Sequence, residues 1–306
     1  MPENHDLIII GGGPSGLAAA LYSGRADLKP LVIEGVSSEA GGQLMWTTDI
    51  ENYPGFEAIP GPELIKKMRD HALKFGAKFV TENVVSVDFK KRPFTIKTED
   101  KEYKAKSVII STGATAVLLG LKSETVFMGR GVSTCATCDA PFFRDKEVAV
   151  VGGGDTAMED SLSLSKFAKK VFVIHRRDQL RASKIMQDRA FANKKIEFIW
   201  NSVVEDILDI KQNKVIAVKL KDVNTGKLSE KKIDGVFIAI GHTPTTTLFK
   251  GQLDLDEKGY IRVNGVKTSV HGIFAAGDVA DPVYKQAITS AGTGCAAALE
   301  AEKFLE

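Results

Sequence analysis

Two glycine-rich turns constrain the fold of this chain more than any other feature. The first, GGGPSG at residues 11–16, follows the apolar run LIII and opens a segment of small, helix-forming residues. The second, GGGDTA at residues 152–157, has the same spacing and the same setting. In such motifs the glycines permit a tight turn, a close approach to a pyrophosphate and close helix–strand packing. One copy is a weak indication, but two copies in a strand–turn–helix–strand context predict two nucleotide-binding βαβ units.

The repeat continues beyond the two turns. Residues 79–106 and residues 197–234 both alternate apolar and polar side chains between polar turns, a pattern typical of an antiparallel β-meander. Each meander leads into an apolar run that ends in glycine, at Gly113 and at Gly241. The alternative is one generic α/β domain that only looks twofold. The length of the repeat favours two domains of the same architecture.

The second domain is expected to be inserted into the first. After a hairpin-like stretch at 253–264, the apolar run in GIFAAGD at 272–278 belongs to neither meander, and we expect it to return to the first sheet. The first domain would then comprise residues 1–115 and 246–306, and the second residues 116–245. The predicted fold class is α/β, with two nested nucleotide-binding domains, each a parallel sheet with helices plus a β-meander.

The residue that follows the second strand of each unit predicts which nucleotide binds there. In the first unit it is Glu34, 18 positions after Gly16, and a carboxylate hydrogen-bonds a free ribose diol and repels a 2′-phosphate. In the second unit the corresponding segment carries a cationic cluster, which suits a 2′-phosphate and consists of His175, Arg176, Arg177 and Arg181. The first unit should therefore bind FAD or NAD, and the second NADP. Two nicotinamide cofactors in one chain make little chemical sense outside transhydrogenation, so FAD is favoured.

Residues 133–141, STCATCDAP, contain a C-x-x-C motif followed directly by an acid. Cys135 and Cys138 supply only two of the four ligands of a structural zinc site. The third cysteine, Cys295, lies far along the chain, and the five histidines form no H-x₃₋₅-H pair. We therefore predict no metal site. An inert buried pair is the other alternative, but a dithiol within a nucleotide-binding unit favours redox chemistry.

Composition excludes several classes of partner. The 306 residues carry 41 basic and 39 acidic side chains, a net charge of +2, so no nucleic-acid or anionic-membrane surface is implied. No apolar run is long enough for a signal peptide or a transmembrane helix. Three cysteines in a chain of this length are typical of a reducing compartment, which predicts a cytoplasmic location.

Taken together, the motifs resemble those of the low-molecular-weight, bacterial-type thioredoxin reductases along essentially the whole chain. The resemblance is carried by GGGPSGLAAALYSGRA, GGQL, NYPGF, FMGRGVSTCATCD, VVGGGDTAMED, HRRDQLRA, AIGHTP, FAAGDV and KQAITSAGTGCAAALEAEKFL. It implies a homodimeric FAD/NAD(P)-linked disulfide reductase. Electrons would pass from NADPH through FAD and the C-x-x-C to thioredoxin or a thioredoxin-like protein.

The resemblance also implies roles for individual residues. Cys138 would face the flavin, Cys135 would attack the partner disulfide, and Asp139 would act as acid and base. The expected FAD contacts are Gly11, Gly13, Ser15, Gly16, Glu34, Gly41, Gly42, Gln43, Leu44, Asn52, Val85, Asp278, Gln286, Ala287 and Ile288. The expected NADPH contacts are Gly154, Asp155, Thr156, His175, Arg176, Arg177 and Arg181.

Three positions depart from the family pattern. Ala140 stands where glycine is more common, Val117 where a basic residue is common, and Asp155 where many members have asparagine. A carboxylate at position 155, close to a phosphate, would weaken NADPH binding. A flavin dithiol oxidase or a ferredoxin-fed reductase could share the FAD unit and the C-x-x-C, but both should lack the arginine cluster. A non-enzymatic redox sensor is the alternative outside enzymes, and it predicts no turnover.

Overall fold

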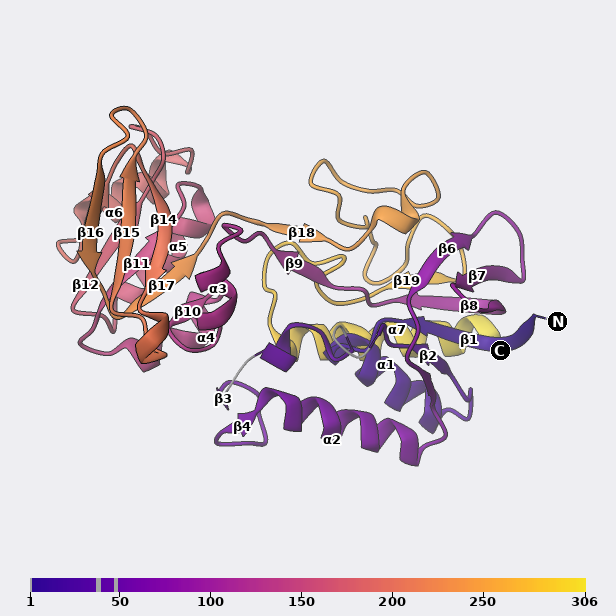
Figure 1. Cartoon of the computed structure of the whole chain (residues 1–306). Coiled ribbons are helices and arrows are strands. Elements are labelled where there is room, and N and C mark those ends of the chain that lie inside the picture. The colour runs from indigo at the N-terminus through magenta and orange to yellow at the C-terminus, as the bar shows by residue number, and fades with distance from the viewer. Residues whose placement is uncertain (1, 37–39, 47–48) are drawn as a thin grey trace. The chain divides into compact units, whose positions relative to one another are not determined.

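The computed structural model describes residues 2–36, 40–46 and 49–306, and the chain divides into two compact units (Figure 1). Unit 1 comprises Met1–Thr115 and Thr243–Glu306, and unit 2 comprises Ala116–His242. The chain passes between them twice, at β9 (Ala114–Ala116) and at β18 (His242–Pro244), and these two short strands pair with each other. The second segment of unit 1 begins at Thr243, whereas the sequence predicted a boundary at residue 246.

Unit 1 is built on a seven-stranded sheet in the order β5-β2-β1-β8-β7-β6, with β19 paired to β8. Its parallel part consists of β1 (Glu3–Ile10), β2 (Leu31–Ile33), β5 (Lys78–Val80), β8 (Glu102–Ile110) and β19 (Ile273–Ala275). The antiparallel part adds β6 (Val84–Asp88) and β7 (Phe94–Thr98). The expected return of the late apolar strand to the first sheet is confirmed by β19.

Strand β8 joins the meander to the parallel sheet because it is long enough to serve both. Its first half pairs with β7 and its second half with β19, while β1 runs in parallel register along its length. The buried apolar half of β1 and the matching half of β8 explain the parallel core, since strands covered on both faces read as continuous apolar runs.

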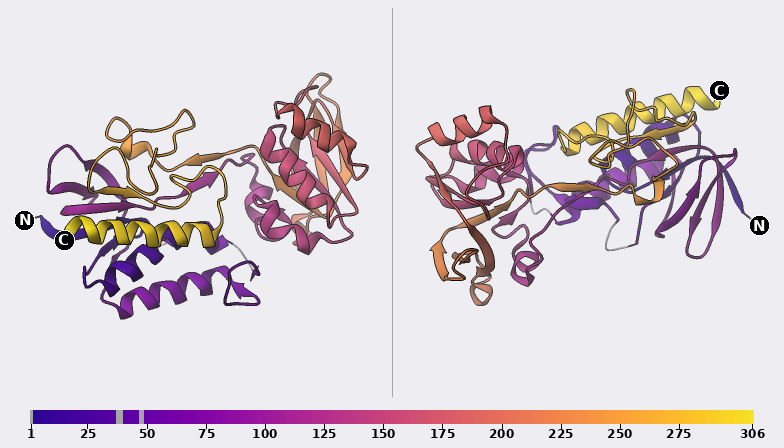
Figure 2. Two further views of the ribbon diagram at one scale, coloured as in Figure 1. Left: turned by 180° about the vertical axis from the view of Figure 1, so that it is seen from behind. Right: turned by 90° about the horizontal axis from the view of Figure 1, so that it is seen from above.

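Three long helices accompany this sheet, α1 (Pro14–Arg25), α2 (Gly61–Lys74) and α7 (Ala287–Leu305). Figures 1 and 2 show α7 alongside α1, with α2 on the other side of α1. Small residues allow α7 and α1 to pack closely, because a Cβ built on Gly294 of α7 would lie 2.1 Å from the carbonyl oxygen of Ser15 in α1. The shorter elements of unit 1 are η1 (Gly42–Trp46), β3 (Asp49–Ile50), β4 (Ile59–Pro60) and η4 (Thr247–Phe249).

Unit 2 has a five-stranded parallel sheet in the order β10-β17-β11-β12-β13. These strands are β10 (Val132–Ser133), β11 (Glu147–Val151), β12 (Lys170–Ile174), β13 (Ile196–Ile199) and β17 (Gly235–Ile238). Its meander forms a separate antiparallel sheet of β14 (Ser202–Leu208), β15 (Ala217–Asp222) and β16 (Leu228–Lys232). The remaining elements are α3 (Lys122–Phe127), α4 (Ala136–Asp139), η2 (Ala140–Phe143), α5 (Asp155–Ser165), α6 (Lys184–Ala192) and η3 (Ile210–Gln212).

Two expectations need adjustment. The two meanders differ, because the one in unit 1 is continuous with the main sheet and the one in unit 2 is not. The hairpin-like stretch 253–264 forms no regular strands and is held by the isolated bridge between Leu255 and Ile261. Across the described ranges, no helix combines the length and apolar character that a membrane span requires.

Candidate redox and nucleotide-binding sites

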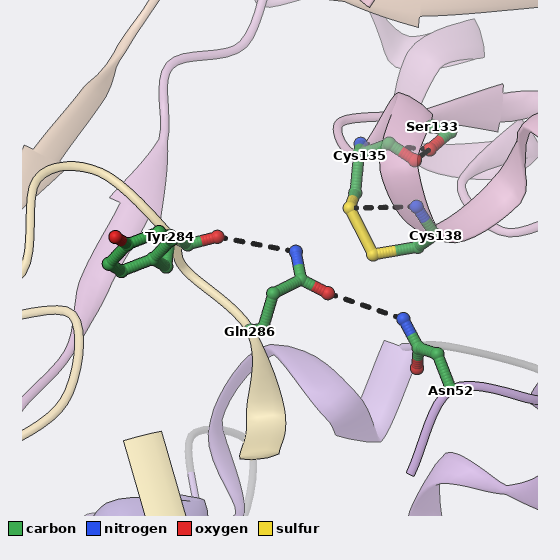
Figure 3. The surroundings of a disulfide bond; sticks show 6 residues. All are labelled: Asn52, Ser133, Cys135, Cys138, Tyr284 and Gln286. Carbon is green, nitrogen blue, oxygen red and sulfur yellow. Dashed lines mark hydrogen bonds between the residues drawn. A yellow bond between two sulfur atoms is a disulfide. The ribbon is translucent and has the colours of Figure 1, made fainter. Parts of the chain in front are cut away.

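Cys135 and Cys138 are bonded to each other in a disulfide, with their Cα atoms 5.3 Å apart (Figure 3). Cys135 is the N-cap of the single-turn helix α4, and its Sγ accepts a hydrogen bond from the Cys138 backbone N–H at 3.2 Å. The segment before the helix is fixed by Ser133, whose hydroxyl oxygen accepts from the Cys135 N–H at 3.0 Å. The sequence thus folds into a short turn that brings the two sulfurs together at the end of β10.

Asp139 follows Cys138 directly and is half-buried. Burial raises the pKa of its carboxyl above the usual range for aspartate, and a hydrogen bond with Ser133 partly offsets the rise. A partly desolvated carboxyl group with a raised pKa next to a dithiol has the properties of a general acid and base.

In unit 2 the glycine turn between β11 and α5 packs against His175, the residue that directly follows β12 and corresponds to Glu34 of unit 1. A Cβ built on Gly153 would lie 2.2 Å from the ring of His175, so only glycine fits there. His175 is 5% exposed, and its Nε2 lies 3.0 Å from the carbonyl oxygen of Gln179. Burial lowers the pKa of His175, which keeps the imidazole neutral at pH 7. His175 therefore supports the turn, and the positive charge of the predicted cluster belongs to the arginines.

The three arginines of this cluster are exposed on the loop after β12. The loop returns to the glycine turn, because the backbone N–H groups of Arg181 and Ala182 both donate to the Gly153 carbonyl oxygen. Asp155 also ties the loop to the turn. One of its carboxylate oxygens accepts from the N–H and the hydroxyl of Ser183, at 2.8 and 2.7 Å. Asp155 thus has a structural role at the start of α6.

In unit 1 the corresponding turn packs on Glu34. A Cβ built on Gly12 would lie 2.6 Å from the Cβ of Glu34, which is the same relation that Gly153 has to His175. Glu34 is 7% exposed, and its carboxylate accepts hydrogen bonds from Arg69 and Thr81. The sequence indicated Glu34 but neither of these partners.

The GGQL segment lies against the same turn. A Cβ on Gly13 would be 4.0 Å from the carbonyl oxygen of Gly41, and one on Gly42 would be 3.8 Å from the Cα of Gly13. Gln43 donates from its side-chain amide to the carbonyl oxygen of Ala114. Leu44 packs beside the small apolar cluster of Ile50, Ile59 and Leu64.

The C-terminal part of unit 1 brings further predicted residues together. Asn52 Nδ2 donates to Gln286 Oε1 at 3.2 Å, and Gln286 Nε2 donates to the carbonyl oxygen of Tyr284 at 3.3 Å (Figure 3). Gln286 is the N-cap of α7, so Ala287 and Ile288 form its first turn. Val85 lies apart from this group, 45% exposed on β6.

Asp278 lies between the end of β19 and the start of α7. Its Oδ1 accepts from the hydroxyl of Ser290 at 2.8 Å, and burial raises the pKa of its carboxyl. The neighbouring Gly277 is packed on α1, where a Cβ would lie 2.6 Å from the Oγ of Ser15. The glycine turn, the β19 end and α7 therefore meet at Ser15.

Known proteins place this arrangement in a family. A family model described as pyridine nucleotide-disulphide oxidoreductase matches residues 5–294. A thioredoxin reductase of Streptomyces coelicolor is 53% identical over 100% of this chain and 95% of its own length. One of Rickettsia conorii is 52% identical over 98% of this chain and 97% of its own. The crystal structure of thioredoxin reductase from Streptococcus pyogenes has a TM-score of 0.94 and 44% identity, and covers 100% of this chain and 99% of that one.

The chain belongs to the thioredoxin reductase family. The predicted family, fold class and enzyme class are confirmed, and the chain is an NADPH-dependent flavoprotein disulfide oxidoreductase with FAD and NADPH as its cofactors. The redox-active pair that such an enzyme requires is the disulfide of Cys135 and Cys138.

The two glycine turns have the properties that dinucleotides require. Gly13 and Gly154 are the N-caps of α1 and α5, and in neither helix does a side chain form the cap hydrogen bond. A Cβ on Gly154 would meet no atom within 4 Å, so space remains in front of the helix N-terminus. Free backbone N–H groups and the positive end of the helix dipole make such a terminus a phosphate site.

Sequence reasoning missed several residues of these sites. Gly12 and Gly153 had a detectable signal, since each is the middle glycine of a GGG run in the repeat. Gly277 could have been suspected because it precedes Asp278 at a strand end. Arg69 and Thr81 gave no signal, because their contact with Glu34 joins segments that are 35 and 47 residues apart.

Proposed function

We propose that this chain reduces the disulfide of thioredoxin, or of a thioredoxin-like protein, with electrons that pass from NADPH through FAD and the Cys135–Cys138 pair. The observation that carries the proposal is the disulfide at the start of α4, directly followed by a half-buried acid whose pKa is raised. A metal or structural role would not call for such an acid. The thioredoxin reductases of Streptomyces coelicolor and Rickettsia conorii support the choice of partner.

In this proposal FAD binds to unit 1, residues 1–115 with 243–306. The pyrophosphate would lie at the N-terminus of α1, with Glu34 at the adenosine ribose. The other residues assigned to it are Gly11, Gly13, Ser15, Gly16, Gly41, Gly42, Gln43, Leu44, Asn52, Val85, Asp278, Gln286, Ala287 and Ile288. When bound, FAD supplies the means to take up a hydride and release its two electrons to a disulfide.

NADPH binds in this proposal to unit 2, residues 116–242. Gly154, Asp155 and Thr156 at the start of α5 would contact the pyrophosphate. Arg176, Arg177 and Arg181 would hold the 2′-phosphate by charge-assisted hydrogen bonds. His175 would act indirectly, since its neutral ring packs on the glycine turn to which the loop that carries those arginines returns. Because Asp155 already accepts two hydrogen bonds from Ser183, its charge is partly compensated.

The reduced pair would act by thiol–disulfide exchange. The Cys135 thiolate attacks one sulfur of the partner disulfide, the partner's S–S bond breaks, and the leaving thiolate takes the proton of Asp139. Cys138 then gives its proton to the Asp139 carboxylate, and its thiolate attacks the Cys135 sulfur of the mixed disulfide. This step restores the Cys135–Cys138 bond and releases the second partner sulfur as a thiolate, which takes a proton from water. The backbone N–H that now donates to Cys135 Sγ would stabilise negative charge on that sulfur.

A homodimer in the cytoplasm belongs to the same proposal. The family resemblance supports the dimer, and the low cysteine content supports a reducing compartment. Sedimentation or light scattering of the flavin-loaded protein at micromolar concentration would test the dimer. A mass of one chain at all concentrations would overturn that part.

The main experiment replaces the cysteines one at a time. Cys135→Ser and Cys138→Ser should each abolish NADPH-dependent reduction of thioredoxin, while NADPH still bleaches the flavin under anaerobic conditions. An anaerobic titration of the unaltered protein should take up about four electrons per flavin, and about two in either variant, because each disulfide accepts two electrons. Cys295→Ser is the matched control and should keep both properties. Normal thioredoxin turnover in either C-x-x-C variant would overturn the proposal.

A further inference from the structure

We propose that Arg69 is a positioning residue for FAD, which holds the Glu34 carboxylate in the orientation that accepts a hydrogen bond from the adenosine ribose. The inference rests on the proposed binding of FAD to unit 1. It concerns a residue with no place among the expected cofactor contacts.

The contact between Arg69 and Glu34 is bidentate. Arg69 Nε donates to Glu34 Oε2 at 3.0 Å, and Arg69 Nη2 donates to Glu34 Oε1 at 3.1 Å. The Thr81 hydroxyl donates to the same Oε1 at 3.0 Å. A guanidinium that grips both carboxylate oxygens fixes the plane of the carboxylate, which one lysine ammonium could not do.

This arrangement leaves Glu34 little freedom to accept elsewhere. A carboxylate offers about four lone-pair positions, two on each oxygen. Arg69 and Thr81 use both positions on Oε1 and one on Oε2. The remaining position is on Oε2, so the carboxylate can accept one further strong hydrogen bond, and its direction is set by Arg69.

Arg69 is itself held in place on two sides. It lies on α2, four positions after Ile65 and three before Ala72, which are both buried. It is therefore at the border of the core-facing side of the helix. Its guanidinium lies 4.4 Å from the centre of the Phe79 ring. Its side chain is 35% exposed, whereas the side chain of Glu34 is 6% exposed.

The buried charge explains why a positioning residue is needed. Glu34 lies against the glycine turn, where a pyrophosphate would add negative charge. A buried carboxylate without a cationic partner is unfavourable and would be driven out of its buried position, and the ribose would then lose a fixed acceptor. Arg69 keeps the Glu34 carboxylate paired and oriented at the same time.

The test uses the deflavinated full-length protein and measures ligand affinity by the change in flavin fluorescence. The ligands are FAD and two forms of it, one with 2′-deoxyadenosine and one with 3′-deoxyadenosine. The variants are Arg69→Gln, Arg69→Lys, Glu34→Gln and the double variant Arg69→Gln/Glu34→Gln. Lys66→Gln is the matched control, because Lys66 is exposed on the same helix and pairs only with Asp70 in the described structure.

The unaltered protein and Lys66→Gln should bind FAD at least about tenfold more tightly than the form that lacks the contacted hydroxyl, since the hydrogen bond is to a charged group. In Arg69→Gln that ratio should fall to below about threefold, and FAD affinity should fall by about 10- to 100-fold. The double variant should bind FAD no more weakly than Glu34→Gln, because Arg69 acts through Glu34.

Other results would overturn the inference. Arg69 is merely structural if Arg69→Gln lowers the affinity for all three ligands by the same factor, so that the preference for FAD over its deoxy forms is kept. It acts independently of Glu34 if the double variant loses affinity by the product of the two single effects. A ratio that survives Glu34→Gln would show that the ribose is read elsewhere, which overturns the proposed FAD contact itself. The cysteine variants test the proposed reductase activity separately.

Arg69→Gln leaves a buried carboxylate unpaired and could fail to fold. The double variant removes that charge, and Arg69→Lys keeps a cation that can reach only one oxygen, so both keep the inference testable. Thermal unfolding of the deflavinated proteins identifies folded variants. Arg69→Lys should lose most of the preference for FAD over the form that lacks the contacted hydroxyl. A preference equal to that of the unaltered protein would contradict the bidentate role.

Discussion

Asp139 has a carboxyl group that the fold biases toward the protonated state. Burial raises its pKa, and the Ser133 hydrogen bond works in the opposite direction. A general acid must hold its proton at working pH, so the rise in pKa serves the role proposed for Asp139. Neither effect is visible in the sequence, where Asp139 is only an acid beside a cysteine.

The rate of thioredoxin reduction should therefore depend on the state of Asp139. It should fall as pH rises through the raised pKa, because the acid that protonates the leaving thiolate is then lost. Asp139→Asn should lower kcat by about 10²–10⁴ and remove this limb of the pH profile. Ser133→Ala removes the group that lowers the pKa of Asp139, so the limb should move to higher pH. An unchanged profile in Asp139→Asn would assign the limb to another group.

The same shift has a consequence for stability. An aspartate whose pKa is higher in the folded than in the unfolded state binds more protons when folded, so stability falls as pH rises from the unfolded to the folded pKa. Above both values the loss is complete. Asp139→Asn should therefore unfold at a higher temperature than the unaltered protein at neutral pH, and the difference should vanish at acidic pH below both values. This result would be checked by calorimetry on the same samples used for kinetics.

At the level of the elements, two neighbouring glycines in the turn of unit 2 are expected to have different roles. Gly153 is needed for packing, and Gly154 leaves space for the nucleotide. Gly153→Ala should lower the melting temperature, because the new Cβ would lie 2.2 Å from the His175 ring. Gly154→Ala should keep the melting temperature, since a Cβ there meets no atom within 4 Å, but should raise the KM for NADPH by filling the space for the pyrophosphate. Equal effects of the two substitutions on stability would contradict this division of roles.

The loop after β12 should determine the preference for NADPH over NADH. A hydrogen bond to a charged group contributes about 1.5–3 kcal/mol, so Arg176→Ala combined with Arg177→Ala should lower kcat/KM for NADPH by about 10²–10⁴. The value for NADH should change little. Arg189→Ala, on the neighbouring helix α6, is the control and should behave like the unaltered protein. Equal efficiency with both nucleotides before mutation would refute the assignment.

The sequence predicted these elements well where the signal is local. Glycine spacing located both turns, and apolar runs located β1, β8, β11 and β17, because a strand–turn–helix unit is defined by neighbouring residues. It could not predict that β8 carries its meander into the main sheet while β14–β16 stand apart, since both meanders alternate in the same way.

Contacts between distant segments could not be predicted from the sequence. Asn52 and Gln286 were each expected near the cofactor, but their hydrogen bond spans 234 positions. The Asp155 carboxylate accepts from the N–H and the hydroxyl of Ser183, a contact that the sequence did not indicate, and its effect on NADPH binding stays a prediction. Each of these contacts depends on how elements pack, and the residues involved have no fixed spacing that a pattern could reveal.

For the whole molecule, the nesting of the units has a mechanistic consequence. The C-x-x-C and the glycine turn proposed to bind NADPH both belong to unit 2, and the glycine turn proposed to bind FAD belongs to unit 1. A disulfide and a nicotinamide ring cannot occupy one face of the flavin together, since each needs near-contact distance for transfer. Only two short passages of chain join the units, which suits rigid-body hinge motion. We therefore expect the enzyme to alternate between two domain arrangements during turnover.

Trapping one arrangement would test this expectation. A mixed disulfide between Cys135 and a thioredoxin that lacks its resolving cysteine should hold the arrangement in which Cys135 is accessible to the partner. In that arrangement the nicotinamide can reach the flavin, so NADPH should reduce the flavin of the covalent complex about as fast as in the free enzyme. Stopped-flow absorbance under anaerobic conditions measures this rate, and NADPH affinity is measured in parallel. If crosslinking stopped flavin reduction while NADPH still bound, both reactions would need the same arrangement, and alternation would be wrong for this enzyme.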